Sequence, residues 1–213
     1  MTSRGAGKQV RKSAAERRSE IVAAAARLGL QEGLECVTRQ RIADELGVRP
    51  GLIHHYFPVV EELVAEAFTS ATTAELDGLL PSAGAPGCVG GDPLRTLQRF
   101  FTLISGAEFD NISKLWINAR HLSRYRPALR DQVVSQELRW CHRIEQIITE
   151  GMAEHSFRCD DPWAAAVRIL AVVDGTGAYI NTSADQRMAP LADLARRIAE
   201  AELDLPVDGL RSP

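Results

Sequence analysis

The stretch TRQRIADELGVRPGLIHHYF, residues 38–57, decides the fold of the N-terminal part of the chain. Thr38 is a favourable N-cap, and it predicts a short helix over about residues 39–46. Gly47 then supplies the backbone freedom that a tight turn between helices requires. Pro50 suits the first position of a second short helix, which we expect to continue to about residue 56. With a third helix before them, these two helices form a helix-turn-helix.

The side chains of this stretch divide into a buried set and an exposed set. The positions that would face a shared core are Ile42, Leu46, Val48, Ile53 and Phe57. The positions left pointing outward are Arg49, Gly51, Leu52, His54, His55 and Tyr56, while Thr38, Arg39, Gln40 and Arg41 open the first short helix beside them. His and Tyr donate to phosphate oxygens or base edges, and Leu52 suits contact with a thymine methyl group. The exposed set therefore predicts DNA binding.

The adjacent histidines His54 and His55 suggest a metal site as an alternative. Neighbouring residues of a helix point about 100° apart, so the two imidazole rings cannot readily share one ion without further ligands. We therefore expect no metal site in this stretch and no cofactor.

The longer segment TRQRIADELGVRPGLIHHYFPVVEELV resembles the DNA-binding signature of the TetR family, over roughly residues 21–63. The spacing that carries the resemblance is unbroken at Ala43, Gly47, Val48, Gly51, Tyr56, Phe57 and Leu63. The resemblance implies DNA contacts at Gln40, Pro50, Gly51, Leu52, His54, His55 and Tyr56, and a phosphate-contacting helix cap at Thr38.

The chain departs from the family pattern at two positions. The family usually carries a lysine where this chain has Val60, and often a Ser or Thr cap where it has Arg49. Arg49 would then replace the lost charge from a nearby position. The missing lysine keeps an alternative open, namely a helical ligand-binding protein of the same fold without specific DNA binding.

Composition and periodicity divide the whole chain into four segments. Residues 1–13 hold four basic residues and almost nothing apolar, which is typical of a flexible arm, and Arg4, Lys8, Arg11 and Lys12 could contact DNA. Residues 14–60 form the helix-turn-helix domain, residues 61–205 a helical ligand-binding and dimerisation domain, and residues 206–213 a flexible tail. The first helix ends at Gly33, and a long helix runs from beyond Pro58 to about Leu80.

Further helices are predicted near residues 93–106, 111–124, 127–155, 162–182 and 191–203, with an irregular Gly- and Pro-rich loop at 81–92. No stretch alternates in the manner of a strand, so the predicted fold class is all-α. The longest apolar run, residues 164–173, is interrupted by Arg168 and is far shorter than the roughly 20 residues that span a bilayer. We expect no membrane helix.

Charge is distributed unevenly along the chain. The first 60 residues carry a balance of +4 and the remainder a balance of −7. A basic head on an acidic body suits a nucleic-acid-binding domain joined to a sensing domain, because phosphate attraction is needed only at the contact. The four cysteines are scattered and the N-terminus lacks an apolar signal-peptide core, which predicts a reduced, cytoplasmic location.

Residues 114–152, KLWINARHLSRYRPALRDQVVSQELRWCHRIEQIITEGM, and residues 174–179, DGTGAY, resemble the C-terminal domain of the choline-responsive BetI subfamily. The resemblance implies the subfamily and not the effector. Aromatic walls with a few polar groups are typical of small-molecule sites, and the candidate ligand-binding residues are Trp116, Arg120, His121, Trp140, Asp174 and Tyr179. Plain core packing is the alternative for each aromatic residue.

Two observations bear on the effector, and they leave its charge open. Asp174 lies in an apolar helix and needs a partner if it is buried, either a cationic ligand or, as we prefer, a structural partner such as Arg120 or a helix-end amide. The acidic body and Asp174 suit a cation. The basic side chains of Arg120, His121, Arg124 and Arg126 suit an anion equally well.

The last two predicted helices carry more apolar surface than one core requires. Residues 164–173 are apolar on nearly every side, and Leu191, Leu194, Ile198 and Leu203 follow in the final helix. We predict a homodimer through these helices, because two heads about 34 Å apart read a palindromic operator. Repression relieved by a small-molecule effector is the default expectation. A helical enzyme is the alternative of another class, but the sequence has no nucleophile elbow, phosphate-binding loop or HExxH motif, so we predict no enzyme.

Overall fold

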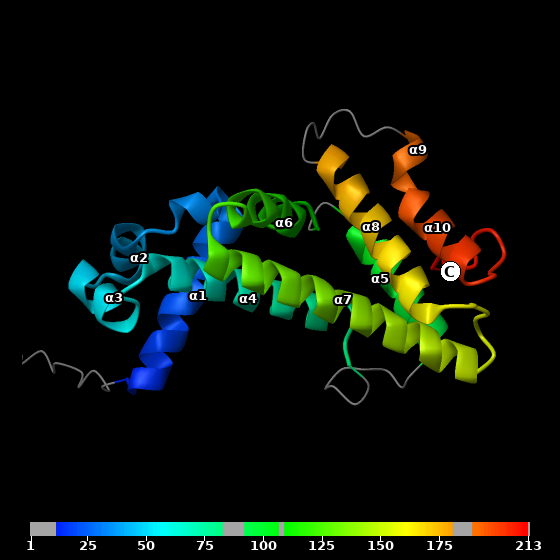
Figure 1. Ribbon diagram of the computed structural model, residues 1–213, viewed down its shortest axis with the longest axis horizontal. Coiled ribbons are helices and arrows are strands. Elements are labelled where there is room, and N and C mark those ends of the chain that lie inside the picture. The colour runs from blue at the N-terminus through cyan, green and yellow to red at the C-terminus, as the bar shows by residue number, and fades with distance from the viewer. Residues whose placement is uncertain (1–11, 83–91, 107–108, 181–188, 213) are drawn as a thin grey trace, which may run out of the picture.

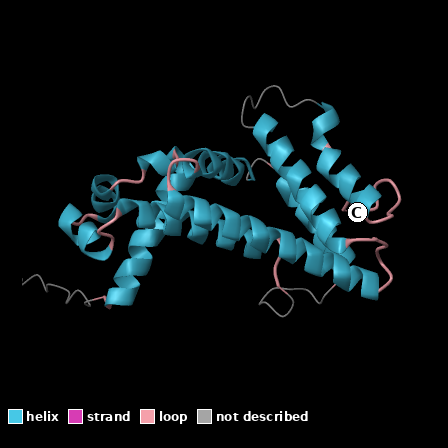
Figure 2. Ribbon diagram, viewed as in Figure 1, coloured by secondary structure: helices cyan, strands magenta, loops and turns pink. Residues whose placement is uncertain are grey.

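The computed structural model describes residues 12–82, 92–106, 109–180 and 189–212. Every regular element in these ranges is a helix (Figure 2), which confirms the all-α prediction. The elements are α1 (Ala14–Glu32), the 3-10 turn η1 (Leu34–Cys36), α2 (Arg39–Leu46), α3 (Pro50–Tyr56), α4 (Val60–Leu79), α5 (Pro93–Ile104), α6 (Phe109–Ser123), α7 (Pro127–Ala153), α8 (Pro162–Ile180), α9 (Ala189–Ala192) and α10 (Leu194–Glu202).

Local capping explains why the first helices begin and end where the sequence predicts. Ser13 and Glu16 form a capping box at the start of α1, in which each side chain accepts the backbone N–H of the other residue. The Thr38 hydroxyl accepts the N–H of Arg41 at the start of α2. Gly47 ends α2 in the left-handed conformation, with φ of 63°. The turn η1 is not predicted by the sequence.

The N-terminal part of the structure, formed by α1, η1, α2 and α3 and here called the head, is stabilised by the apolar residues that the helix-turn-helix pattern predicts. Ile42, Ile53 and Phe57 are fully buried, and Leu46 and Val48 are half-buried against the same core. Since α1 packs on α2 and along α4, the short helices α2 and α3 are fixed at one end of the molecule (Figure 1).

The body is built around two long helices, α4 and α7, which pack along each other (Figure 1). Helices α5, α6 and α8 all pack against α7, and α10 packs on α8. Helix α6 also contacts α1 and η1 in the head, so it joins the two parts of the chain. The predicted final helix is divided into α9 and α10. In the described ranges no helix has both the length and the apolar content that crossing a bilayer requires.

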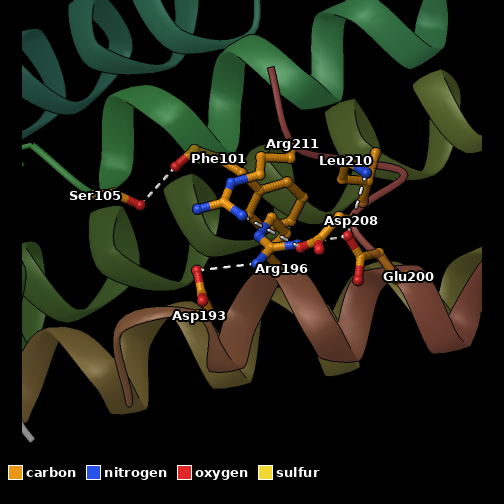
Figure 3. Close-up of polar contacts among 8 residues, drawn as sticks. All are labelled: Phe101, Ser105, Asp193, Arg196, Glu200, Asp208, Leu210 and Arg211. Atoms are coloured by element: carbon orange, nitrogen blue, oxygen red, sulfur yellow. Dashed lines mark hydrogen bonds and ion pairs between the residues drawn. The ribbon is translucent and has the colours of Figure 1, made fainter. Parts of the chain in front are cut away.

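The C-terminal residues 206–212, which we expected to form a flexible tail, are docked on the body. Leu210 is fully buried, and its N–H donates to the Glu200 carboxylate at 3.2 Å. Arg196 forms ion pairs with Glu200 and Asp208, each at 2.8 Å, as Figure 3 shows. This docking could not be predicted from the sequence, because Leu210 and Asp208 alone form no periodic pattern. Their partners are brought near only by tertiary structure.

Most of the predicted basic arm and the centre of the predicted loop, residues 1–11 and 83–91, lie outside the described residues. Arg4, Lys8 and Arg11 are therefore not placed. Lys12 is described, and its ammonium pairs with Glu20 at 2.5 Å on the first turns of α1.

Candidate nucleic-acid interface and ligand cavity

Helix α3 presents its predicted DNA contacts to solvent. Arg49, Pro50, Gly51, His54 and His55 are exposed, and Leu52 and Tyr56 are half-buried. Pro50 opens the helix, where a missing N–H costs no intrahelical bond. The His55 and Tyr56 rings meet edge to face, with centroids 5.3 Å apart. The exposed side of α3 is thus a short surface of basic, aromatic and small groups.

Gly51 makes this surface accessible to a close neighbour. A Cβ atom built on Gly51 would meet no atom within 4 Å beyond its chain neighbours and the backbone of its own helix. Packing inside the protein therefore gives no reason for a glycine at this position in the first turn of α3. The missing side chain leaves room for a partner outside the chain.

The predicted contacts on α2 are engaged within the protein. The Arg39 guanidinium donates to the carbonyl oxygens of Phe57, at 3.3 Å, and Pro58. Gln40 donates to Asp44 at 2.8 Å, and Arg41 pairs with Glu32 at 2.5 Å. Arg39 thus fastens the C-terminal end of α3 to the start of α2, a positioning role that the sequence pattern does not reveal.

A small cavity lies within the body, between α4, α5, α6, α7 and α8. Its volume is about 20 Å³, room for about one water molecule. Four of the predicted ligand-binding residues line it, and the complete lining is Glu75, Phe100, Phe109, Trp116, Arg120, Glu137, Trp140, Leu170, Val173 and Asp174. A ligand larger than water enters only if side chains move.

The structure does not bring His121 and Tyr179 to this cavity. His121 is exposed and its ring packs edge-on against Tyr125 at 6.0 Å between centroids, while Tyr179 is 59% exposed. Helical phase explains both cases. His121 points about 100° away from Arg120, and five residues along α8 turn Tyr179 away from Asp174 by more than a right angle.

Arg120 pairs with two acidic side chains that line the cavity. Its guanidinium pairs with Asp174 at 2.5 Å and with Glu137 at 2.9 Å, and it lies 5.1 Å from the centroid of the Trp116 ring. Burial raises the pKa of Asp174, and the adjacent guanidinium opposes that rise. Asp174 therefore has the structural partner that we preferred from the sequence.

Glu75 on α4 is the acid that the sequence does not single out. The indole N–H of Trp116 donates to its carboxylate at 3.0 Å, and in the described parts of the chain no Lys or Arg forms an ion pair with it. Burial raises the pKa of Glu75 to about 8, and the negative charge of Asp174 adds to the rise. Nearby, the buried indole N–H of Trp140 has no acceptor among the described groups.

A Glu75→Gln variant is expected to become more stable than the parent protein as pH rises. The folded state holds a proton on Glu75 up to about pH 8, whereas the unfolded chain releases it near 4.5. The parent therefore loses stability between these values, by at most roughly 1.4 kcal/mol per pH unit from this group. Urea unfolding at pH 5, 7 and 9 measures the difference. Parallel pH profiles for the two proteins would contradict a raised pKa at Glu75.

The described residues contain no group of three or more His, Cys, Asp or Glu side chains suited to a metal ion. The cavity is lined by three carboxylates, one guanidinium and aromatic side chains. Carboxylates and ring faces are groups that attract cations in protein sites.

Comparison with known proteins fits both halves of this arrangement. The family model described as bacterial regulatory proteins of the tetR family matches residues 21–67, and that of the BetI-type transcriptional repressor C-terminal domain matches residues 93–205. No curated protein matches the chain.

Solved structures of low sequence identity share the fold. A TetR-family transcriptional regulator from Rhodococcus sp. has a TM-score of 0.70 at 23% identity, over 93% of this chain and 100% of that one. A transcriptional regulator from Saccharomonospora viridis, in complex with choline, has a TM-score of 0.69 at 24% identity, over 88% and 95%. A TetR regulator from Haloarcula marismortui has a TM-score of 0.72 at 21% identity, over 89% and 99%. The chain belongs to the TetR family of bacterial regulatory proteins, with a C-terminal domain of the BetI type.

Proposed function

We propose that the protein is a homodimeric, cytoplasmic transcriptional repressor that binds a palindromic operator through α3 and releases it when a small organic cation enters the cavity. It acts as a regulator and not as an enzyme. One observation carries the choice of effector, namely the Glu75 carboxylate, held by an indole N–H in an aromatic-walled cavity.

The charges in the cavity favour a cation over an anion. Arg120 already pairs with Glu137 and Asp174, so little of its charge is left to attract an anion. Glu75 is the third carboxylate beside the single guanidinium of Arg120, so its ionisation adds a negative charge that no basic side chain of the cavity balances. The faces of Trp116 and Trp140 add attraction for a cation once water is excluded. Choline, bound by the regulator from Saccharomonospora viridis, is a cation of this class.

The surfaces of α8 and α10 support the homodimer. Val167 and Tyr179 on α8 and Leu194 on α10 are 39%, 59% and 36% exposed, although they are large and apolar. Large apolar side chains exposed on two helices that pack together favour a contact with a second copy. Two copies of α3 then read two half-sites about one turn of DNA apart.

Asn118 on α6 supplies a path from the cavity to the head. Its Oδ1 accepts the N–H of Leu34 at 2.8 Å, and its amide donates to Glu35 at 2.7 Å. The same helix carries Trp116 and Arg120, which line the cavity, while η1 leads directly into α2. A shift of α6 on ligand binding would therefore move η1 through Asn118. Because η1 precedes α2 directly, this shift would change the position of α2 and α3.

An Asn118→Ala variant is expected to bind the cation but to release DNA poorly. The coupling between two ligands is usually 5- to 150-fold in affinity, and we expect it to fall at least fivefold in the variant. Operator affinity with and without tetramethylammonium measures it, with Lys114→Ala, an exposed change on the same helix, as control. Equal coupling in the variant and the parent protein would remove Asn118 from the path.

Selection of random duplexes tests the proposed DNA binding and its alternative. The purified protein and an Arg49→Ala, Tyr56→Ala variant are each presented with a duplex library at two salt concentrations. We expect an enriched palindrome that is lost in the variant, with affinity that falls steeply as salt rises. Weak binding without enrichment would instead favour a ligand-binding protein of the same fold.

A further inference from the structure

An open groove of about 600 Å³ lies outside the cavity, between α1, α4, α5 and α6. Its polar edge is formed by Arg27, Gln31 and Asn111, and Arg27 is already paired with Glu45 at 2.7 Å. Its remaining lining is mostly apolar and consists of Leu30, Ala71, Ala74, Leu79, Leu103, Phe109 and Ile112, with Glu75 and Gly78. Several of these apolar side chains are only half-buried, so the groove offers surface that a ligand can cover.

The groove and the cavity meet at two side chains. Glu75 and Phe109 line both spaces. They therefore stand between the open groove and the small cavity. Glu75, which has no basic partner among the described residues, thus lies at the inner end of the groove. Movement of Glu75 and Phe109 would join the groove to the cavity.

We propose that the ligand is an amphiphilic cation, an ammonium head with an aliphatic chain, whose head replaces water beside Glu75 and whose chain lies in the groove. This rests on the proposed function. The charge of the head complements Glu75, and the chain covers the half-buried floor contributed by α1, α4 and α5. The groove wall includes Arg27, which forms an ion pair with Glu45 on α2. An aliphatic chain in the groove therefore also contacts a residue that connects α1 to the helix-turn-helix.

Gly78 provides a variant that fills the groove without disturbing the fold. It lies near the end of α4, is exposed, and has no protein atom within 4 Å of a built Cβ. Gly78→Leu therefore occupies space that the chain would use. Ala153→Leu adds the same kind of apolar surface on α7, outside the residues that line the groove, and is the matched control.

Calorimetry with alkyltrimethylammonium ions, from tetramethyl to octyltrimethyl below their micelle concentrations, tests the inference on the full chain. For the parent protein and Ala153→Leu we expect affinity to rise two- to fourfold, roughly, for each added methylene. For Gly78→Leu we expect tetramethylammonium affinity to be unchanged and most of the gain with chain length to be lost. Thermal unfolding confirms that each variant is folded.

The outcomes distinguish the inference about the groove from the proposed function, which requires only a cationic effector. If tetramethylammonium and its longer homologues all fail to bind, the cationic effector itself is wrong. If tetramethylammonium binds but affinity does not rise with chain length, only the groove inference is overturned. A gain with chain length that Gly78→Leu leaves intact overturns it as well, because the chain then lies elsewhere.

Discussion

Replacing Glu75 by Gln is expected to weaken tetramethylammonium binding by roughly 100-fold at pH 9, about 2.7 kcal/mol. At that pH the parent carboxylate is ionised, since its pKa is about 8. Gln keeps the shape and still accepts the Trp116 N–H, so the variant removes charge and little else. Calorimetry on both proteins measures the loss, and Glu145→Gln, an acid on α7 paired with His142 outside the cavity, is the control.

The same substitution carries a pH signature that a purely structural role would not produce. Below about pH 8 the cation competes with a proton for Glu75, so parent affinity should fall by up to tenfold per pH unit. Between pH 9 and pH 6 the expected loss is on the order of 100-fold. The Gln variant should show no such dependence. A parent affinity that is constant over this range would rule out Glu75 as the group that meets the cation.

Gly51→Leu is expected to lower operator affinity by roughly 100-fold while the protein stays at least as stable. Beyond its chain neighbours and its own helix backbone, the built Cβ has no atom within 4 Å, and residue 51 is already helical, so the fold can accept a side chain here. A DNA backbone or base edge that lies close to Gly51 would clash with the leucine side chain. The leucine would then hold α3 away from the major groove of the DNA. Duplex binding and urea unfolding, measured together, separate the two effects.

The matched control for this experiment is Gly78→Leu, a second exposed helical glycine with no atom within 4 Å of its Cβ. It lies on α4 in the body, so DNA affinity without effector should be unchanged. Equal DNA affinity for Gly51→Leu and the parent protein would show that α3 does not approach DNA at this residue, and the docking proposed for the head would have to be abandoned.

The head was predictable from sequence because its signals are local. Thr38, Gly47 and Pro50 act on the backbone within a few residues of themselves, and the apolar spacing over residues 42–57 spans only two short helices and the turn between them. The destination of the Arg39 side chain was not predictable, since its acceptors are the carbonyls of Phe57 and Pro58, which tertiary packing brings near.

The cavity was predictable only in part, for a related reason. Trp116, Arg120, Trp140 and Asp174 drew attention as aromatic or charged residues in apolar helices, and they do meet. His121 and Tyr179 are similar in residue type, but their positions on α6 and α8 turn their side chains away from the cavity and into solvent. Glu75 stands among ordinary polar residues of α4, and only the packing of α4 against α6 places it beside Trp116. No local pattern marks such an acid.

The central claim, that a small cation controls DNA binding, is tested most directly by releasing the selected operator duplex. The parent protein is held on the duplex at fixed pH and ionic strength, and tetramethylammonium chloride is titrated against sodium chloride, with tert-butanol as a neutral compound of similar shape. We expect replacement of sodium by tetramethylammonium at constant ionic strength to lower operator affinity at least fivefold, and tert-butanol to leave it unchanged. Equal effects of tetramethylammonium and sodium, or release by tert-butanol as well, would contradict the account.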